Sequence, residues 1–393
     1  MISLESAEEL ISRNARALNE TEWVDLGSSL GRVLAEDVFS DTDMPPFDKS
    51  AMDGYACRRE DLTQTMVTVE TIAAGTEPSR AIGKGHCAKI MTGAKVPEGA
   101  DCVIMIENTV LTDDGRVMVN DNIIQDDNIC RRGEDTRKGS LVLRKGSFIN
   151  PQTLALLASV GKTNVQVTRK LQVGLLCTGS ELVEPGEIPS GVQIRNSNAA
   201  QITAQIEAAG AIPVYCGIIS DNHDQIAGKL NEMLGKYPVV LITGGASVGD
   251  FDFMPEILQQ PGFIVHFKKV GIQPGKPVVY ATCNDRHIFG LSGNPVSSFL
   301  QFELLVKPLL FKMYGSATYS PNIQMILGEP VKRKQTERRL FLPVVVNSDG
   351  QIINTEFHGS AHIAALKNIF GFAIIPEGIA EIKKGEIVNV RPI

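Results

Sequence analysis

The chain changes character at the segment LQVGLLCTGSE, which occupies residues 171–181. Its first part is almost entirely apolar, and it ends in a turn of small and polar residues, Thr178-Gly179-Ser180-Glu181. A short apolar run that ends in such a turn predicts a β-strand followed by a loop. Downstream, strand-like and helix-like stretches alternate, which is the pattern of a parallel sheet with crossover connections.

The pattern predicts elements along the whole chain. In the alternating region we expect strands at 171–177, 212–219, 239–243, 263–267 and 288–291, and helices at 198–209, 224–234 and 295–314. Upstream, apolar residues at helical spacing behind Ser3 and Ser6, two candidate N-caps, open a helical segment within 3–35. We also expect short strands at 66–72, 102–106 and 117–119, a helix at 151–160, and strands at 340–346 and 372–375.

These elements predict a multidomain α/β plus β fold. Residues 1–45 and 137–170 are expected to form one discontinuous linker domain of helical and extended segments, into which a β-rich domain at 46–136 is inserted. Residues 171–316 are expected to form a central three-layer α/β/α domain, and residues 317–393 a small C-terminal β-barrel.

The composition is that of an ordinary globular enzyme. A length of 393 residues predicts two to four domains, and a formal net charge of -7 lacks the basic excess that nucleic-acid binding requires. The seven cysteines contain no C-x-x-C pair, which favours reduced thiols over a zinc site. The acidic N-terminal segment predicts a helix rather than a signal, and no apolar run is long enough for a membrane span. We therefore expect a cytoplasmic protein with small-molecule substrates and neither nucleic-acid nor membrane partners.

Three expected strands end in loops of small residues. In open α/β sheets, ligands bind beyond the carboxyl ends of the strands, and free backbone N–H groups there can hold an anion. The sequence therefore predicts an anion cradle; the alternative is that the glycines only turn the chain. The candidate ligand-binding residues of these loops are Thr178, Gly179, Ser180, Gly244, Gly245, Ser247, Gly293, Asn294 and Pro295.

Charged residues follow the same strands. Glu181, Asp221, Asp250 and Asp252 supply carboxylates, and Mg²⁺ is held by one or two such groups together with phosphate oxygens. A magnesium-assisted phosphoryl step is therefore a hypothesis; the alternative is that Asp221 and Asp252 cap helices. In the segment 274–277, prolines flank Lys276, whose natural counterpart is an oxyanion.

A solvated turn is the alternative for the neighbouring Lys268 and Lys269. The β-rich region adds three polar segments, at 48–56, 90–94 and 131–135. The first is a polar, tightly turned segment that packing alone does not explain, and loops of this kind often carry function. Their Asp-Gly and Thr-Gly pairs are also common turn signals.

Taken together, these segments resemble the molybdopterin molybdenumtransferases, that is, the bacterial MoeA proteins and the gephyrin E domain, along essentially the whole chain. The motifs that carry the resemblance are PFDKSAMDGYA from Pro46, IMTGA from Ile90, RRGED from Arg131, TGSEL from Thr178, TGGASVGDFD from Thr243, QPGKP from Gln273 and SGNPVS from Ser292.

The resemblance implies a homodimer whose α/β domain binds molybdopterin in a cleft lined by both subunits. The substrates would be adenylylated molybdopterin and molybdate, and Mg²⁺ would assist the release of AMP as molybdenum joins the dithiolene. Protein partners would be molybdopterin adenylyltransferase and molybdoenzyme chaperones. By motif, the catalytic residues would be Asp53, Thr92, Asp135 and Glu181. The metal-side and substrate-side carboxylates would be Asp221 and Asp252, and the residues holding molybdate would be Lys276, Ser297 and Ser360.

Three positions depart from the family pattern. Ser292 stands where proline is frequent, Gln273 replaces a lysine, and an arginine expected near Phe341 falls on Pro343, with Arg338 and Arg339 as candidate replacements. Two alternative functions stay open on sequence grounds. One is a molybdopterin adenylyltransferase or a nucleotide-processing relative on the same fold, and the other is a gephyrin-like scaffold without catalysis.

Overall fold

The computed structural model describes residues 1–120, 127–244, 254–316 and 322–393. The chain forms two compact units. The first contains Met1–Ala35, Gly146–Asn150 and Gln166–Ile393, and the second contains Glu36–Lys145 and Pro151–Val165. The chain therefore leaves the first unit after its N-terminal segment and returns to it, so that the second unit is an insertion.

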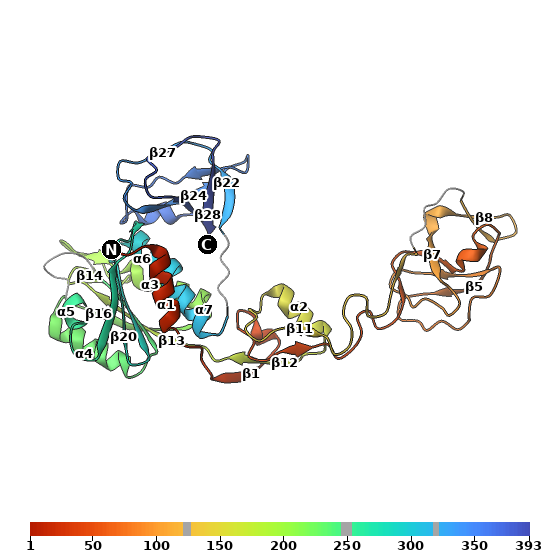
Figure 1. Cartoon of the computed structure of the whole chain (residues 1–393), viewed down its shortest axis with the longest axis horizontal. Coiled ribbons are helices and arrows are strands. Elements are labelled where there is room, and N and C mark those ends of the chain that lie inside the picture. Colours follow the sequence, from red (N-terminus) through yellow and green to blue (C-terminus); the bar gives the residue numbers. More distant parts are fainter. Residues whose placement is uncertain (121–126, 245–253, 317–321) are drawn as a thin grey trace. The chain divides into compact units, whose positions relative to one another are not determined.

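A six-stranded sheet with the order β16-β13-β17-β21-β20-β18 forms the centre of the first unit (Figure 1). Its strands are β13 (Gln172–Thr178), β16 (Ile212–Ile219), β17 (Val239–Thr243), β18 (Phe263–Lys269), β20 (Pro277–Cys283) and β21 (Arg286–Leu291). Five of these were predicted. These five strands run parallel to one another, as predicted, but the sheet also contains β20, which was not predicted and pairs antiparallel with both of its neighbours. Only a short turn joins β20 to β21, and strands joined in this way pair antiparallel.

Helices cover both faces of this sheet. On one face, Leu175 and Leu241 belong to a buried cluster with residues of α1 (Leu4–Asn14), α3 (Ser197–Ala208), α6 (Pro295–Gln301) and α7 (Lys307–Met313). On the other face, Leu176 and Ile242 are buried with residues of α4 (His223–Leu234) and α5 (Met254–Ile257). Since neighbouring side chains of a strand point to opposite faces, the apolar strands supply both layers at once.

The helix ends follow ordinary capping chemistry. Ser3 caps α1, as predicted, and its side chain accepts a hydrogen bond from Ser6 N at 3.1 Å. Asn222 caps α4, so the alternative that Asp221 is a helix cap is wrong. The predicted helix at 295–314 is interrupted by a π-helical turn at Phe302–Val306, just before Pro308. Proline lacks the N–H group that would continue the α-helical hydrogen bonding.

The C-terminal segment of the first unit forms a second sheet. Its strands follow the order β19-β24-β26-β28-β22, and β25 pairs with β24. They are β19 (Ile272–Gln273), β22 (Ile323–Ile326), β24 (Arg339–Val346), β25 (Ile352–Asn354), β26 (Gly371–Ile375) and β28 (Ile387–Pro392). A bridge between Leu327 and Ile352 links the end of β22 back to β25, so these pairings close into a ring around an apolar core.

The second unit is built on a four-stranded sheet with the order β5-β6-β4-β7. Its strands are β4 (Gly54–Cys57), β5 (Val67–Ile72), β6 (His86–Ile90) and β7 (Cys102–Met105); the unit also contains β9 (Val117–Val119) and α2 (Pro151–Ser159). The end of the polar segment 48–56 also contributes to packing, because β4 is a buried inner strand. A Cβ atom on Gly54 would lie 2.0 Å from the Ile104 carbonyl oxygen, so this position has no room for a side chain.

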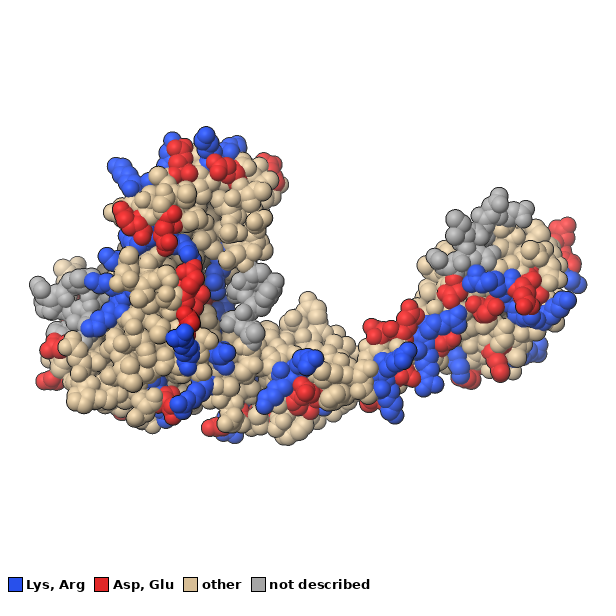
Figure 2. Space-filling model, in the orientation of Figure 1, with Lys and Arg blue, Asp and Glu red and all other residues tan. Residues whose placement is uncertain are grey.

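None of the helices in the described ranges has the length and apolar character needed to span a bilayer. On the face drawn in Figure 2, basic and acidic residues are interspersed over each unit rather than gathered into one basic area.

Candidate functional site

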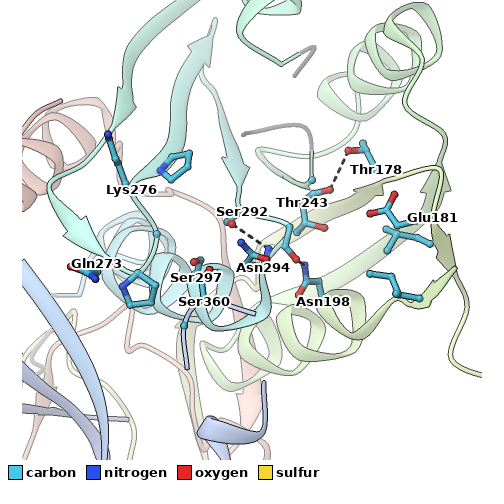
Figure 3. A pocket seen from close by; sticks show the side chains of 18 of the residues that line it. Thr178, Glu181, Asn198, Thr243, Gln273, Lys276, Ser292, Asn294, Ser297 and Ser360 are labelled. Carbon is cyan, nitrogen blue, oxygen red and sulfur yellow. Dashed lines mark hydrogen bonds between the residues drawn. The ribbon is translucent and has the colours of Figure 1, made fainter. Parts of the chain in front are cut away.

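A cavity of about 610 Å³ lies in the first unit, beyond the carboxyl ends of β13, β17 and β21 (Figure 3). Its volume is within the range of small-molecule binding sites. The structure brings together on its wall eight of the predicted site residues: Thr178, Glu181, Gly244, Lys276, Gly293, Asn294, Ser297 and Ser360. Gly179, Ser180 and Pro295 belong to the same loops but are not part of this wall, and Gly245 and Ser247 lie outside the described residues.

Close packing explains the glycines of the cavity wall. Gly244 has a φ of +86°, and a Cβ atom there would lie 2.1 Å from the carbonyl oxygen of Thr178. The Thr178 hydroxyl donates to the Thr243 carbonyl oxygen at 3.4 Å, so the ends of β13 and β17 are in contact. Gly293 in turn would place a Cβ atom 3.6 Å from Gly244 Cα. These glycines therefore let three loops meet closely, in addition to turning the chain.

Positive charge enters the cavity from two segments. Lys276 lies between β19 and β20, and Arg338 immediately precedes β24. Parallel pairing of β19 with β24 brings the two segments together, with Ile272 opposite Arg339. Within the described part of the chain, neither Lys276 nor Arg338 forms an ion pair with a carboxylate. An anion in the cavity would therefore meet two cations that no described carboxylate pairs with.

The structure separates the two arginines that were candidates for one role. Arg338 lines the cavity, and its Nη1 lies 3.4 Å from the Ile272 carbonyl oxygen. Arg339 instead forms an ion pair with Glu5 at 2.6 Å. Lys268 and Lys269 lie in strand β18 rather than in a solvated turn, and neither is part of the cavity wall.

The acidic residues fall into different places. Glu181 is on the wall, at the side opposite Lys276 (Figure 3). Asp221 is half-buried and not part of the wall; its carboxylate accepts from Ser180 N at 3.2 Å, and its own N–H donates to the Ser180 hydroxyl at 3.2 Å. These two bonds join the loops that follow β13 and β16. Asp250 and Asp252 lie outside the described residues.

The other predicted catalytic residues belong to the second unit. Asp53 accepts hydrogen bonds from Thr92 N at 2.6 Å and from the Thr92 hydroxyl at 2.7 Å. The hydrogen bond from the Thr92 hydroxyl has the largest effect and the one from Thr92 N the next. Together they hold the pKa of Asp53 below its ordinary value and keep the carboxylate ionised. Asp135 is exposed, and its N–H donates to the Met44 carbonyl oxygen at 3.0 Å. Asp53 and Thr92 thus form one structural pair.

The sequence did not identify Asn198 as a site residue, and it indicated Gln273 only as a replacement for a lysine. Asn198, in the first turn of α3, is buried on the cavity wall and donates to the Gly293 carbonyl oxygen at 2.7 Å. A polar residue in the first turn of a helix beside the sheet edge was the available signal. Gln273 lines the cavity, yet its Oε1 atom is buried without a hydrogen-bond partner among the described residues.

Fold and cavity together define a class of protein: an α/β protein with a cavity of small-molecule size at the carboxyl edge of its sheet, lined in part by Lys276 and Arg338. Within this class, residues 2–161 match the family described as "MoeA N-terminal region (domain I and II)", and residues 174–312 match the "Probable molybdopterin binding domain".

Similar proteins cover nearly the whole chain. A molybdopterin molybdenumtransferase from Bacillus subtilis is 37% identical over 94% of this chain and 89% of its own length. One from Staphylococcus aureus is 33% identical over 93% and 90%. A crystal structure of the molybdopterin biosynthesis moeA protein from Pyrococcus horikoshii matches with a TM-score of 0.81 and 31% identity, and both chains are covered completely. The chain belongs to the molybdopterin molybdenumtransferase family.

Proposed function

We propose that this protein transfers molybdenum from molybdate to molybdopterin during the biosynthesis of the molybdenum cofactor, and that the pterin enters in its adenylylated form. The observation that carries the proposal is the cavity at the strand ends, where Lys276 and Arg338 form no ion pair with any carboxylate of the described residues. The similarity to molybdenumtransferases extends over both units, which disfavours an adenylyltransferase that shares only the α/β part.

Molybdate requires hydrogen-bond donors rather than a nucleophile, because its oxygens carry two negative charges. We assign its binding to Lys276, Ser297 and Ser360, with Arg338 in place of the missing family arginine. Ser297 and Ser360 lie next to each other in Figure 3, since the Val296 N–H donates to the Ser360 carbonyl oxygen at 3.0 Å. Two cations and two hydroxyls suit a doubly charged oxyanion.

The pterin and its phosphates are assigned to the strand-end loops. Thr178, Gly244 and Asn294 lie on the cavity wall. Gly244 has no side chain, so its backbone is accessible to a ligand. We extend the assignment to Gly179, Ser180 and Pro295, which belong to the same loops but not to the wall. It also includes Gly245 and Ser247, which lie outside the described residues. Glu181 faces this side of the cavity and is assigned a catalytic role together with Asp53, Thr92 and Asp135.

A magnesium ion would fit the donor set in a limited way. Mg²⁺ takes one or two carboxylates and completes its coordination with phosphate and water oxygens, so it needs no cluster of three acidic residues. The described residues contain no such cluster. We assign the ion to Asp221 and Asp252. When bound, it would polarise the phosphoanhydride and offset the charge on departing AMP. Asp221 is held for this by the Ser180 N–H, which occupies only Oδ2.

The proposal includes assembly. We infer that the protein acts as a homodimer with a cleft to which both subunits contribute, in the cytoplasm, and that it exchanges substrate and product with an adenylyltransferase and with molybdoenzyme chaperones. Analytical ultracentrifugation of the purified chain tests the dimer: a species of one chain at micromolar concentration contradicts it.

The reaction itself is tested by stoichiometry. The full chain is mixed with adenylylated molybdopterin, molybdate and Mg²⁺, and AMP and molybdenum cofactor are quantified in the same samples. One AMP per cofactor formed is expected. Binding of the pterin with no AMP release under these conditions would support a scaffold instead. Glu181→Gln, which removes the charge while keeping the shape, is expected to slow both products together.

A further inference from the structure

A buried glutamine joins two walls of the cavity. Gln301, the last residue of α6, is fully buried and is not part of the cavity wall. Its Oε1 accepts a hydrogen bond from Ser292 N at 2.8 Å. Its Nε2 donates to the carbonyl oxygens of Gly275 at 2.8 Å and Pro277 at 2.7 Å. All three bonds therefore end on two segments of the proposed site: the segment that presents Lys276 and the strand-end loop at Ser292.

The Gly275 and Pro277 carbonyls lie on either side of Lys276, so Gln301 holds the backbone that presents the lysine. The contact is close. A Cβ atom on Gly275, whose φ is +99°, would lie 3.2 Å from Gln301 Nε2. Within the described part of the chain, no other hydrogen bond connects the Lys276 segment to the loop at Ser292.

We propose that Gln301 is a positioning residue that fixes Lys276 at the distance from the Ser292 loop at which molybdate is held. Only a primary amide meets the requirement at this position, because it offers two donors for two carbonyls and one acceptor for an N–H. A carboxylate offers acceptors alone, and an apolar side chain leaves three buried backbone groups without partners. The inference rests on the proposed role of Lys276 in binding the oxyanion.

Two substitutions separate the two sides of Gln301. In Gln301→Glu, the carboxylate still accepts from Ser292 N but faces two carbonyl oxygens, so the Lys276 segment alone is released. In Gln301→Met, bonds on both sides are lost. Gln205→Leu is the matched control: Gln205 is also buried, and its Nε2 donates to the Phe299 carbonyl oxygen of the same helix at 3.2 Å and to Glu303 at 2.9 Å, but among the described residues it has no hydrogen bond to either cavity loop.

The experiment measures KM for molybdate, kcat and the Kd of adenylylated molybdopterin in the full chain, with amide hydrogen exchange of residues 270–278. For Gln301→Glu we expect the KM for molybdate to rise at least about tenfold, since displacing a positioned group by roughly 1 Å can cost up to about 100-fold. The pterin Kd should stay within about twofold, and exchange at 270–278 should increase. Gln301→Met should raise both the KM for molybdate and the Kd of the pterin, and Gln205→Leu should change neither value.

Lys276→Ala is measured beside these variants to separate two failures. If Lys276→Ala raises the KM for molybdate while Gln301→Glu leaves it and the exchange rates unchanged, the positioning role of Gln301 is wrong and the role of the lysine stands. If Lys276→Ala leaves the KM unchanged, the oxyanion assignment itself fails. If Gln301→Glu and Gln205→Leu lower kcat equally and leave the KM unchanged, Gln301 contributes only to the stability of the fold and has no positioning role.

Discussion

Replacing Gly244 by alanine should damage the cavity far more than the same change at Gly293. The Cβ atom of an alanine at 244 would lie 2.1 Å from the Thr178 carbonyl oxygen, and contacts below 3.0 Å are essentially never observed for Cβ atoms. The ends of β13 and β17 must therefore separate by about 0.9 Å, the difference between these two values. At Gly293 the corresponding contact is 3.6 Å, which is ordinary van der Waals distance.

Two costs add at Gly244. Holding an alanine at a φ of +86° costs about 1–2 kcal/mol, and forcing a methyl group into a packed position costs about 1–3 kcal/mol more. The free energy of unfolding should fall by about 2–5 kcal/mol. For Gly293→Ala, whose φ is not in the left-handed region, the change should stay within about 1 kcal/mol and can be stabilising, because alanine restricts the unfolded chain.

Urea unfolding followed by far-UV circular dichroism measures the difference, and the midpoints of the two variants are compared at equal slope. Isothermal titration with molybdopterin then tests the site: Gly244→Ala should bind more weakly even under conditions where it is fully folded, because Thr178 on the cavity wall is displaced. Free energies of unfolding of Gly244→Ala and Gly293→Ala that agree within about 0.5 kcal/mol would refute the reasoning, since surface changes alone reach that size.

Three further results are expected. Lys276→Ala should raise the molybdate concentration for half-maximal cofactor formation about tenfold or more with kcat little changed, as a lost charge-assisted bond of about 1.5–3 kcal/mol requires. Arg338→Ala should do the same, whereas Arg339→Ala should cost only about 0–1 kcal/mol of stability in a chemical denaturation and leave the molybdate dependence unaltered. Thr92→Val should raise the pKa of Asp53, which NMR titration measures. The lowered pKa stabilises the folded state above pH 3.8, and this stabilisation is lost as the pH falls through the lowered pKa, so it should be smaller in the variant. An unchanged pKa of Asp53 would contradict the role of the Thr92 hydroxyl.

The strands of the central sheet could be predicted because their signal is local. β13, β16 and β17 are apolar runs bounded by turns, and the predicted ranges agree with the structure to within a residue. β20 was not predicted, because its apolar residues directly follow the Pro-Gly-Lys-Pro motif, whose glycine and prolines are typical of a loop. The antiparallel direction of β20 follows from the short turn that joins it to β21, so it could be predicted only once β20 itself is recognised as a strand.

The site was predictable to the extent that it consists of strand ends. Thr178, Gly244 and Gly293 follow apolar runs, so the rule on carboxyl ends of strands finds them. Asn198 and Gln301 escape this rule, because their importance lies in hydrogen bonds to loops that are distant in sequence. The same holds for the bonds between Asp221 and Ser180, which no spacing reveals.

The contrast between two adjacent arginines shows how the structure reserves charge for a ligand. Arg339 is the first residue of β24 and is neutralised by Glu5 from α1. Arg338, one position earlier, lies on the cavity wall, and its hydrogen bonds go to a carbonyl oxygen and to Gln335 rather than to a carboxylate. Successive side chains of an extended chain point in opposite directions, so one pairing of β19 with β24 suffices to place one charge against Glu5 and the other on the cavity wall that also contains Lys276. Two cations beside one cavity repel each other, and an oxyanion bound between them relieves that repulsion, so binding of molybdate should stabilise this part of the first unit.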